Sequence, residues 1–419
     1  MPLHRWLRSA AALYALPVMG VYLYLLLSGE LQNIADNWRD ATVVATSSGV
    51  MALGPTCAAV GAWEGARLRR GGVLDGTPVR RPAAVLLWSA LPIGAAAVAV
   101  LAFAFALVTP EVGGIPGAPD PPVVAVGLLV IGAWSLAGVA AGRFLHPAIG
   151  VPLLLIGTWL WLAYPQALEP LWIRHLTGEN LGTCCSTDTV LDRRVLWAQA
   201  LVAAAVAVVA YLVWSRGFRP IAVKAAVVAV PAAALVVAVS LVDGLGADSD
   251  RPRTGGLECV REQGVEVCVW RERRARLGYA ARLVVPASRR LAVAIGMPAP
   301  RRITEGAARD RESWHFTVAP QAGDDDVVFA LATGFLPPAS PPCAKDREFD
   351  GDAAYVPVGT WLAIKAGLPR AVVAAKTGPM ENGDAVTRVL ARPRADQIRW
   401  FRRNLAALRS CDIRPVDVE

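Results

Sequence analysis

Long apolar stretches constrain this chain more than any other feature of its sequence. Seven of them precede Asp243, over residues 10–27, 41–62, 83–108, 122–142, 147–164, 195–214 and 221–242. A helix of about 20 residues crosses a hydrocarbon core about 30 Å thick, because each residue adds about 1.5 Å. The fifth stretch is the shortest, so six spans remain an alternative to seven. The pattern predicts a polytopic α-helical membrane protein with about seven transmembrane helices in residues 1–243.

The remainder of the chain, residues 244–419, has the mixed pattern of a soluble α/β domain. Predicted strands lie at Val265–Trp270, Trp314–Val318 and Val327–Leu331, and predicted helices at Arg271–Ile295, Ala353–Ala366 and Ala395–Leu408. Pro286 is expected to interrupt the first of these helices. Because residues 243–256 are rich in Gly and Asp, we expect a short polar tether between the two domains.

The distribution of arginine among the predicted loops sets the orientation, because Lys and Arg accumulate on the cytoplasmic side of a membrane. If the N-terminus is inside, the inner segments hold Arg5, Arg8, Arg67, Arg69, Arg70, Arg80, Arg81, Arg143, Arg216 and Arg219. The outer loops then hold only Arg39, Arg174, Arg193 and Arg194. An odd number of spans makes residues 244–419 extracytoplasmic, whereas loss of the fifth span would place them in the cytoplasm.

The seven cysteines agree with this orientation, because disulfides persist outside the cytoplasm. Only Cys57 lies in a predicted span, and the other six fall in segments that the arginine distribution places outside. Six thiols allow 15 pairings. We expect Cys259 to pair with Cys268, which flank a possible hairpin, and Cys343 to pair with Cys411.

The outer segment between the fifth and sixth stretches contains another group of candidate ligands. Cys184 and Cys185 follow His175, and Asp188 comes next. The two thiols can bond to each other, reach separate partners or, with the imidazole and the carboxylate, bind a soft metal. Because the spacing matches no standard site and an oxidising compartment favours disulfides, we expect these cysteines to be bonded and no metal to be held.

Composition argues against a large soluble enzyme and against nucleic-acid binding. Charged residues make up 18% of the chain and the mean hydropathy is +0.43, whereas soluble domains average about 25% charged residues. The net charge of +8 comes from arginines scattered over loops and the C-terminal third, not from one patch. Nearly all basic residues are arginine, a bias typical of a GC-rich bacterial genome and hence of a bacterial plasma membrane protein.

Several common catalytic motifs are absent from the sequence. It has no G-x-x-x-x-G-K-[ST] loop, so any ATP hydrolysis must take place in a partner subunit. The H-E-x-x-H, G-x-S-x-G and S-x-x-K patterns of hydrolases are also missing. We therefore expect a chain that is not an enzyme, with no catalytic residues and no cofactor. A membrane enzyme without a motif, built on residues 184–188 or on His315, is the least favoured alternative.

A basic stretch extends the second span beyond the membrane at residues 62–70. It supplies Arg67, Arg69 and Arg70, and Arg80 and Arg81 follow before the next span. Such residues can anchor the helix on the cytoplasmic side, contact acidic lipid or form a docking elbow for a separate cytoplasmic subunit. These five arginines are the candidate partner-docking residues.

Polar side chains inside the predicted spans are few, and none is Asp, Glu or His, although ion-coupled carriers usually need one. The main ones are Thr46, Ser47, Ser48 and Gln199. They can line a path or hydrogen-bond neighbouring helices. Two G-x-x-x-G pairs, Gly61–Gly65 and Gly138–Gly142, let helices approach closely, and a homo- or heterodimer interface is one use of such spacing.

Taken together, these segments resemble the permease-type membrane subunits of bacterial ABC exporters. The resemblance rests on the second span with Gly54-Pro55 and the basic stretch at 62–70, and on the outer loop at 175–178 with Cys184-Cys185. The opening of the outer domain, Cys259 and residues 267–270, adds to it. The resemblance implies that a separate cytoplasmic ATPase docks on the inner elbows. The chain departs from a plain exporter permease, which usually has six spans and no large outer domain.

The sequence therefore predicts a permease-like integral membrane subunit of an ABC-type export system that works with a separate ATPase. The alternative is a membrane-anchored extracytoplasmic binding or sensing protein without transport activity. In that case the helices only anchor the disulfide-bonded outer domain and relay its signal.

Overall fold

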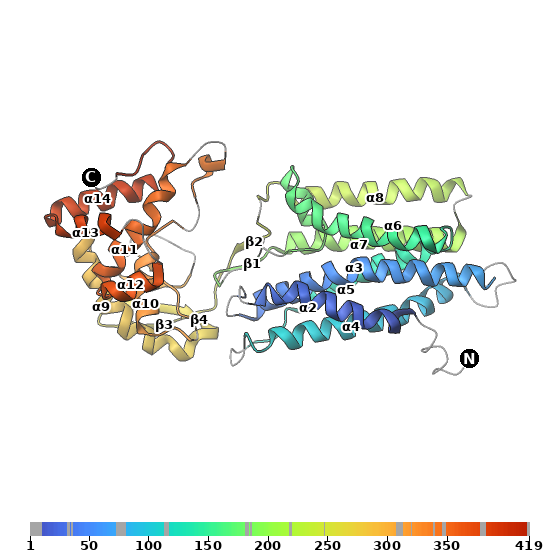
Figure 1. Cartoon of the computed structure of the whole chain (residues 1–419), viewed down its shortest axis with the longest axis horizontal. Coiled ribbons are helices and arrows are strands. Elements are labelled where there is room, and N and C mark those ends of the chain that lie inside the picture. Colours follow the sequence, from blue (N-terminus) through green and yellow to red (C-terminus); the bar gives the residue numbers. More distant parts are fainter. Residues whose placement is uncertain are drawn as a thin grey trace. The chain divides into compact units, whose positions relative to one another are not determined.

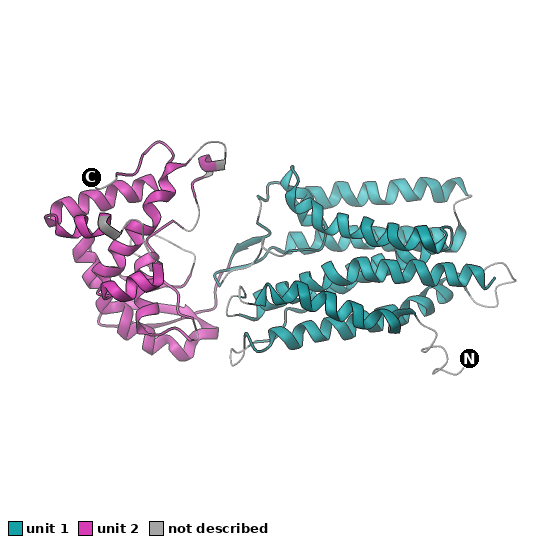
Figure 2. Ribbon diagram, viewed as in Figure 1, with its two compact units in different colours: residues 1–252 teal, residues 253–419 magenta. Residues whose placement is uncertain are grey.

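The computed structural model divides into two compact units, residues 1–252 and 253–419 (Figure 2). It describes residues 11–31, 34, 37–72, 81–112, 117–180, 184, 187–217, 220–246, 248–306, 313–319, 321–337, 340–345, 349–377 and 383–416. Arg80 and Cys185, which we singled out in the sequence, lie outside the described residues. The division comes a few residues after the expected boundary at 243/244, so residues 244–252 belong to the first unit.

Unit 1 is a bundle of long helices that run side by side (Figure 1). They are α2 (Ala11–Ser28), α3 (Trp38–Arg70), α4 (Pro82–Val108), α5 (Pro121–Gly142), α6 (Pro147–Ala163), α7 (Arg193–Arg216) and α8 (Ile221–Val242). Seven helices in the described part of the chain are thus long and apolar enough to cross a membrane. All seven apolar stretches of the sequence are helical, and α6, the shortest, continues as the 3-10 turn η2 (Tyr164–Ala167).

The helices begin where local chemistry allows it. Pro82, Pro121 and Pro147 stand in the first turns of α4, α5 and α6, where a backbone N–H has no helical acceptor and its absence costs nothing. The side chain of Asn37 accepts a hydrogen bond from the N–H of Asp40 and caps α3. Asp192 caps α7 in the same way through the N–H of Arg194.

The helix α3 lies at the centre of unit 1. Of an apolar segment of 18 residues in α3, 83% is buried in the unit, whereas the same fraction for α8 is 11%. With 33 residues it is about 50 Å long. Its buried residues include many hydroxyl-bearing and small ones beside valines and Leu53, and it packs closely against α5, α6, α2 and α4.

Close packing of α3 on α5 depends on the two G-x-x-x-G pairs, which face each other within the chain. A Cβ atom on Gly65 would lie 2.1 Å from the carbonyl oxygen of Val139, and one on Gly138 would lie 2.1 Å from that of Ala58. A Cβ atom on Gly61 would lie 2.6 Å from the carbonyl oxygen of Ser135, and one on Gly142 would lie 2.2 Å from that of Ala62. These glycines are buried between the two helices, so their spacing serves packing inside unit 1.

Short elements close one end of the bundle. Between α6 and α7 the chain forms the 3-10 helix η3 (Leu171–Leu176) and the strand β1 (Thr189–Leu191). After α8, the strand β2 (Asp250–Pro252) pairs with β1 in antiparallel register. The expected polar tether at residues 243–256 is therefore partly a strand.

Unit 2 contains a four-stranded sheet in the order β3, β4, β5, β6. The strands are β3 (Leu257–Glu262), β4 (Val265–Trp270), β5 (Arg302–Thr304) and β6 (Ser313–His315). The first two form a hairpin whose turn residues Gln263 and Gly264 both have positive φ, as a tight two-residue turn requires. The strands β4, β5 and β6 are parallel, so their carboxyl ends share one edge of the sheet.

The helix α9 (Leu277–Ile295) packs on β3 and β4, and the other helices of unit 2 supply most of the remaining core. These other helices are η4 (Arg271–Arg276), α10 (Asp324–Thr333), η5 (Pro342–Lys345), η6 (Asp350–Ala354), α11 (Tyr355–Ala366), α12 (Arg370–Thr377), α13 (Gly383–Ala391) and α14 (Arg394–Ala407). Val267 and Ile303 of the sheet, Leu291 of α9 and Trp361 of α11 belong to one buried cluster. Trp361 stacks on Phe401 of α14 with ring centroids 5.2 Å apart.

Two local predictions in unit 2 are wrong. Val327–Leu331 is not a strand but part of α10, in which Val327, Val328 and Leu331 are buried at helical spacing. The side chain of Asp326 accepts the N–H of Gly323 and stabilises the start of this helix. Pro286 does not interrupt α9, which runs from Leu277 to Ile295; the irregular part is η4, before it. The loss of one hydrogen bond at Pro286 is offset by the buried apolar face of α9.

Candidate functional sites

The first candidate site is the basic end of the helical unit. Buried Glu64 of α3 accepts hydrogen bonds from the N–H of Ala11 (2.8 Å) and from Nε of Arg67 (2.7 Å). Arg69 Nη1 lies 3.5 Å from the carbonyl oxygen of Arg143 in the turn between α5 and α6. These contacts place the start of α2, the end of α3 and the α5–α6 turn together.

The same end also includes α4 and α7. Trp214 of α7 donates its indole N–H to the carbonyl of Pro82 (2.9 Å), and Arg143 donates to the carbonyl of Trp214. Described arginines at this end are Arg67, Arg69, Arg70, Arg81, Arg143 and Arg216, whereas Arg39, Arg174, Arg193 and Arg194 belong to segments at the opposite end. The structure thus gathers the four described docking candidates at one end, although Arg67 and Arg69 also have structural contacts.

The second candidate site is a buried polar loop, residues 175–180, at the opposite end of unit 1. All six residues are buried although they form no regular helix or strand beyond the end of η3. Gly178 has φ +94°, and a Cβ on it would lie 2.9 Å from a methyl group of Val130 in α5. The loop therefore passes so close to α5 that glycine is required at this position.

Asn180 of the buried loop links α3 to α7. Its backbone N–H donates to Ser47 Oγ (3.1 Å), and its side-chain oxygen accepts from Gln199 Nε2 (3.0 Å). Buried Glu179 accepts a hydrogen bond from Gln166 Nε2. Two of the four polar residues that the sequence placed inside the spans, Ser47 and Gln199, are thus bridged by a residue that sequence reasoning missed.

The other two deep hydroxyls, Thr46 Oγ1 and Ser48 Oγ, are buried and have no hydrogen-bond partner within the described part of the chain. Both belong to α3, next to Ser47. A buried polar atom without a partner costs about 1–3 kcal/mol. The first third of α3 therefore carries three consecutive buried hydroxyls, two of which have no partner in the described residues.

His175 is held by the loop that follows α8. Its Nε2 lies 2.9 Å from the carbonyl oxygen of Gly246. Burial lowers the pKa of His175, with a smaller contribution from Arg174, against the opposing effects of Gly246 and Asp248. We therefore assign a neutral imidazole whose Nε2–H donates to Gly246.

A soft-metal site at His175 would need a thiolate ligand, and the described residues near His175 do not supply one. Cys184 is disulfide-bonded, so its sulfur is not available as a thiolate ligand. Cys259, Glu266 and Cys268 also come within metal-binding distance of one another, but the two cysteines are bonded.

Both expected disulfides of the α/β unit are formed. Cys259 and Cys268 are directly opposite each other in β3 and β4, with an S–S distance of 2.09 Å. Cys343 and Cys411 are bonded at 2.02 Å and join η5 to the segment after α14, 68 residues away. Cys57 is a buried free thiol in α3.

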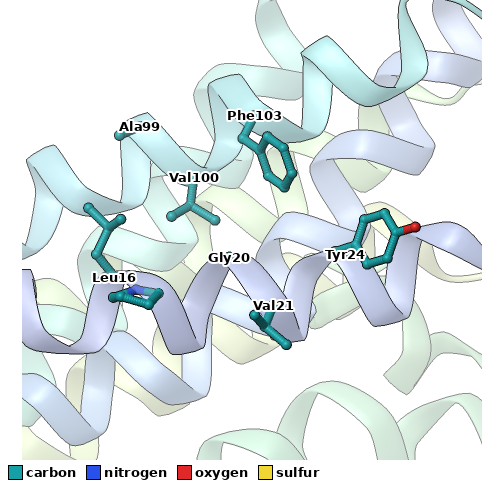
Figure 3. A pocket seen from close by; sticks show the side chains of 8 residues that line it. Leu16, Gly20, Val21, Tyr24, Ala99, Val100 and Phe103 are labelled. Atoms are coloured by element: carbon teal, nitrogen blue, oxygen red, sulfur yellow. The ribbon is translucent and has the colours of Figure 1, made fainter.

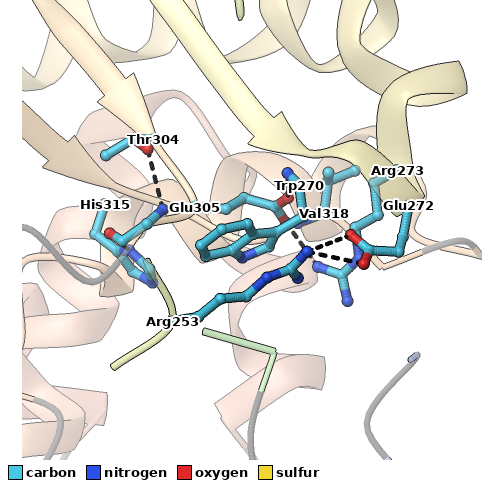
Figure 4. Close-up of polar contacts among 9 residues, drawn as sticks. Arg253, Trp270, Glu272, Arg273, Thr304, Glu305, His315 and Val318 are labelled. Atoms are coloured by element: carbon cyan, nitrogen blue, oxygen red, sulfur yellow. Dashed lines mark hydrogen bonds and ion pairs between the residues drawn. The ribbon is translucent and has the colours of Figure 1, made fainter. Parts of the chain in front are cut away.

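The third candidate site is the carboxyl edge of the parallel strands in unit 2, where open α/β sheets usually bind ligands. Glu305 follows β5 and is fully buried, with Oε1 2.6 Å from Arg273 Nη1 (Figure 4). It also accepts the backbone N–H groups of Trp270 and Val318, each at 2.9 Å. Burial raises the pKa of Glu305, and the Arg273 guanidinium and the two N–H groups oppose this shift.

Arg253 covers the indole of Trp270 at the same edge. Its Cζ lies 4.0 Å from the ring centroid, and its guanidinium makes two hydrogen bonds of 2.8 and 2.9 Å to Glu272 (Figure 4). The indole N–H of Trp270 is buried and has no partner within the described residues. His315, at the end of β6, lies with Nδ1 3.3 Å from the carbonyl of Gly306. This edge thus carries one buried ion pair, one largely buried ion pair, a buried N–H without a partner in the described residues and a histidine.

Comparisons with known proteins assign no activity to this chain. A family model described as "Domain of unknown function (DUF7224)" matches residues 267–411, about a third of the chain and most of unit 2. No curated protein and no solved structure matches the chain.

Proposed function

We propose that the chain is a multi-pass protein of a bacterial plasma membrane, with α2 to α8 as its spans. The support is the apolar surface of unit 1. Large side chains such as Leu25, Leu91, Ile156 and Val236 are exposed on four different helices. Water-soluble proteins rarely expose contiguous apolar patches larger than a few hundred Å². A lipid environment removes that cost.

The orientation that we propose has the basic end in the cytoplasm and unit 2 outside. The arginines at one end of unit 1 fit the charge bias of cytoplasmic loops. Two disulfides in unit 2 fit an oxidising compartment. In intact cells, an impermeant maleimide should label Cys343 and Cys411 only after an impermeant reductant is added. Labelling that requires the membrane to be opened would contradict this orientation.

Within that frame, we propose that the chain is the permease-like subunit of an ABC-type export system. The observation that carries the proposal is α3, a single helix that joins the buried hydroxyls of Thr46, Ser47 and Ser48 to the basic end at Arg67–Arg70. A rigid helix of this kind connects an outer polar region to a cytoplasmic docking surface. The partner is a separate ATPase that contacts Arg67, Arg69, Arg70, Arg80 and Arg81.

The test is co-purification of an ATPase with the full-length chain in mild detergent. Reversing the charges of Arg67, Arg69 and Arg70 together to glutamate should remove the ATPase. Arg193→Glu is the matched control, because Arg193 is exposed at the opposite end of unit 1. A complex that survives the triple reversal, or that Arg193→Glu disrupts equally, contradicts docking at the basic end.

The alternative, an extracytoplasmic binding or sensing protein, is favoured by one observation. The carboxyl edge of the sheet in unit 2 has a buried indole N–H without a partner in the described residues, beside Arg253 and Glu305. This alternative predicts that the full-length chain purifies without an ATPase and that a small polar ligand raises its thermal stability. Replacing Trp270 by phenylalanine should then abolish the ligand effect without unfolding unit 2.

A further inference from the structure

A groove beside the basic end has the form expected for one phospholipid. It lies over α3 between α2 and α6, has a volume of about 470 Å³ and is lined by Ala11, Tyr14, Ala59, Val60, Trp63 and Val151. Trp63 is 45% exposed, although it is the largest side chain of this lining. Tryptophan with one exposed edge is typical of the level at which acyl chains meet headgroups.

The apolar wall of this groove continues directly into basic side chains. Val60, Trp63, Arg67 and Arg70 follow at spacings of three and four residues, so they form one stripe on α3, here named the Trp63 stripe. Arg70 Cζ lies 5.6 Å from the ring centroid of Trp63. Because each residue rises about 1.5 Å, Arg67 and Arg70 lie about 6 and 10 Å beyond Trp63 along the helix.

The charge at the end of the stripe favours an anion. Arg67, Arg69 and Arg70 stand against the single carboxylate of Glu64, which is buried and already hydrogen-bonded to Ala11 and Arg67. The side chain of Arg67 remains 42% exposed although its guanidinium is paired with that carboxylate. The last turn of α3 therefore presents net positive charge next to the apolar groove.

We propose that the Trp63 stripe binds an anionic phospholipid. Arg67 and Arg70 contact its phosphate, and one acyl chain occupies the groove along Val60 and Val151. The site adds a ligand to the basic end and rests only on the membrane embedding of the proposed function, not on an ATPase partner. Arg69, whose Nη1 contacts the carbonyl of Arg143, and Arg81 at the start of α4 are outside the stripe.

A second groove of similar size provides an internal control. It lies between α2 and α4 and has a volume of about 450 Å³ (Figure 3). Its lining, Leu16, Pro17, Gly20, Val21, Tyr24, Ala99, Val100 and Phe103, has no charged side chain. A groove that holds an acyl chain but has no arginine nearby should bind anionic and neutral lipids equally. Only the first groove should therefore prefer anionic lipids.

The experiment measures thermal unfolding of the full-length protein in mild detergent with added lipid. Phosphatidylglycerol should raise the unfolding temperature, because a ligand that binds only the folded state stabilises it. Phosphatidylcholine with the same chains, and glycerol phosphate without chains, should do so far less. Each arginine near an anionic headgroup contributes about fivefold in affinity, so Arg67→Gln with Arg70→Gln should weaken phosphatidylglycerol binding about 30-fold.

Matched variants separate the headgroup from the chain. Arg81→Gln should leave the preference for phosphatidylglycerol intact. Val151→Phe, which fills the first groove, should weaken phosphatidylglycerol binding. Gly20→Leu should not, because nothing lies within 4 Å of a Cβ placed there in the second groove. If the double arginine variant does not fold, Arg70→Gln alone serves, with bound lipid counted by native mass spectrometry.

Four results would overturn the proposal. Two of them are stabilisation by phosphatidylcholine or by glycerol phosphate that equals stabilisation by phosphatidylglycerol. The third is a loss of phosphatidylglycerol binding in Arg81→Gln as large as in the double arginine variant. The fourth is a double variant, Arg67→Gln with Arg70→Gln, that loses a protein partner while its lipid preference is unchanged. Alkaline carbonate extraction tests the membrane embedding separately. A chain that resists extraction but shows no lipid preference contradicts only the lipid site.

Discussion

Arg273 and Glu305 form the ion pair whose loss is most informative. Their side chains are 5% and 0% exposed, and Nη1 and Oε1 are 2.6 Å apart. Glu305 also fixes the N–H groups of Trp270 and Val318. In Arg273→Met this carboxylate keeps its two N–H donors but loses the guanidinium. Breaking one side of a buried pair typically costs about 3–5 kcal/mol, and we expect unit 2 to lose about that much near neutral pH.

The loss should depend on pH in a defined direction. Burial raises the pKa of Glu305 above the ordinary 4.5, and Arg273 opposes that shift. Without Arg273, the folded-state pKa rises further above that of the unfolded chain. A group of this kind contributes stability that is fully present below the unfolded pKa and is lost as pH rises through the folded pKa. Arg273→Met should therefore be less destabilising at about pH 5 than at about pH 8.

Amide hydrogen exchange of the full-length protein is the suitable assay, because Trp270 and Val318 report on the site directly. A loss of about 3–5 kcal/mol corresponds to a fall in protection of about 10²-fold or more. Arg271→Met is the control, since the Arg271 side chain is 65% exposed and should change stability by less than about 1 kcal/mol. A fall that equals the control, or that is the same at both pH values, would refute the reasoning.

Three further predictions concern other parts of the chain. Gly138→Ala should destabilise unit 1 by about 1–3 kcal/mol in a thermal scan, because its Cβ would lie 2.1 Å from a backbone oxygen. Gly132→Ala on the same helix meets nothing within 4 Å and should be neutral or stabilising; equal effects would contradict the packing argument. Burial lowers the pKa of His175, so the stability of unit 1 should fall as pH drops through the ordinary value of 6.5. His175→Gln should flatten this pH dependence of stability, and an unchanged slope would point to another group. Removing the Cys343–Cys411 bridge, which closes a separation of 68 residues, should cost unit 2 about 4 kcal/mol in denaturant unfolding; a loss below about 1 kcal/mol would show that the bridge does not constrain the unfolded chain.

The long helices could be predicted because each is a continuous apolar stretch, and helices of water-soluble proteins are rarely apolar over such a length. The bridges Cys259–Cys268 and Cys343–Cys411 followed from position and compartment, and the structure forms both. The segment at 327–331 was misjudged because a short apolar run fits a strand and a buried helix equally well. Acidic residues in the first turn of α10 favour the helix, and Asp326 among them accepts the N–H of Gly323.

The buried loop at residues 175–180 could not be predicted from periodicity. Its polar sequence reads as an outer loop, and its partners Ser47 and Gln199 are distant in the chain. Only Gly178 carried a signal, since glycine allows close approach of the backbone to a neighbouring helix. The Glu305 site was hidden for a similar reason, because burial of a single glutamate depends on tertiary contacts with Arg273 and Val318.

The segment at residues 243–256 is more ordered than the expected short polar tether. Pro252 pairs with Thr189 in the β1–β2 ladder of unit 1, and the next residue, Arg253, is fixed on Trp270 and Glu272 in unit 2. Consecutive residues are thus held by different units. Within unit 1, β1 ends directly before Asp192, the cap of α7, so the β1–β2 ladder holds residues 250–252 next to the start of that helix.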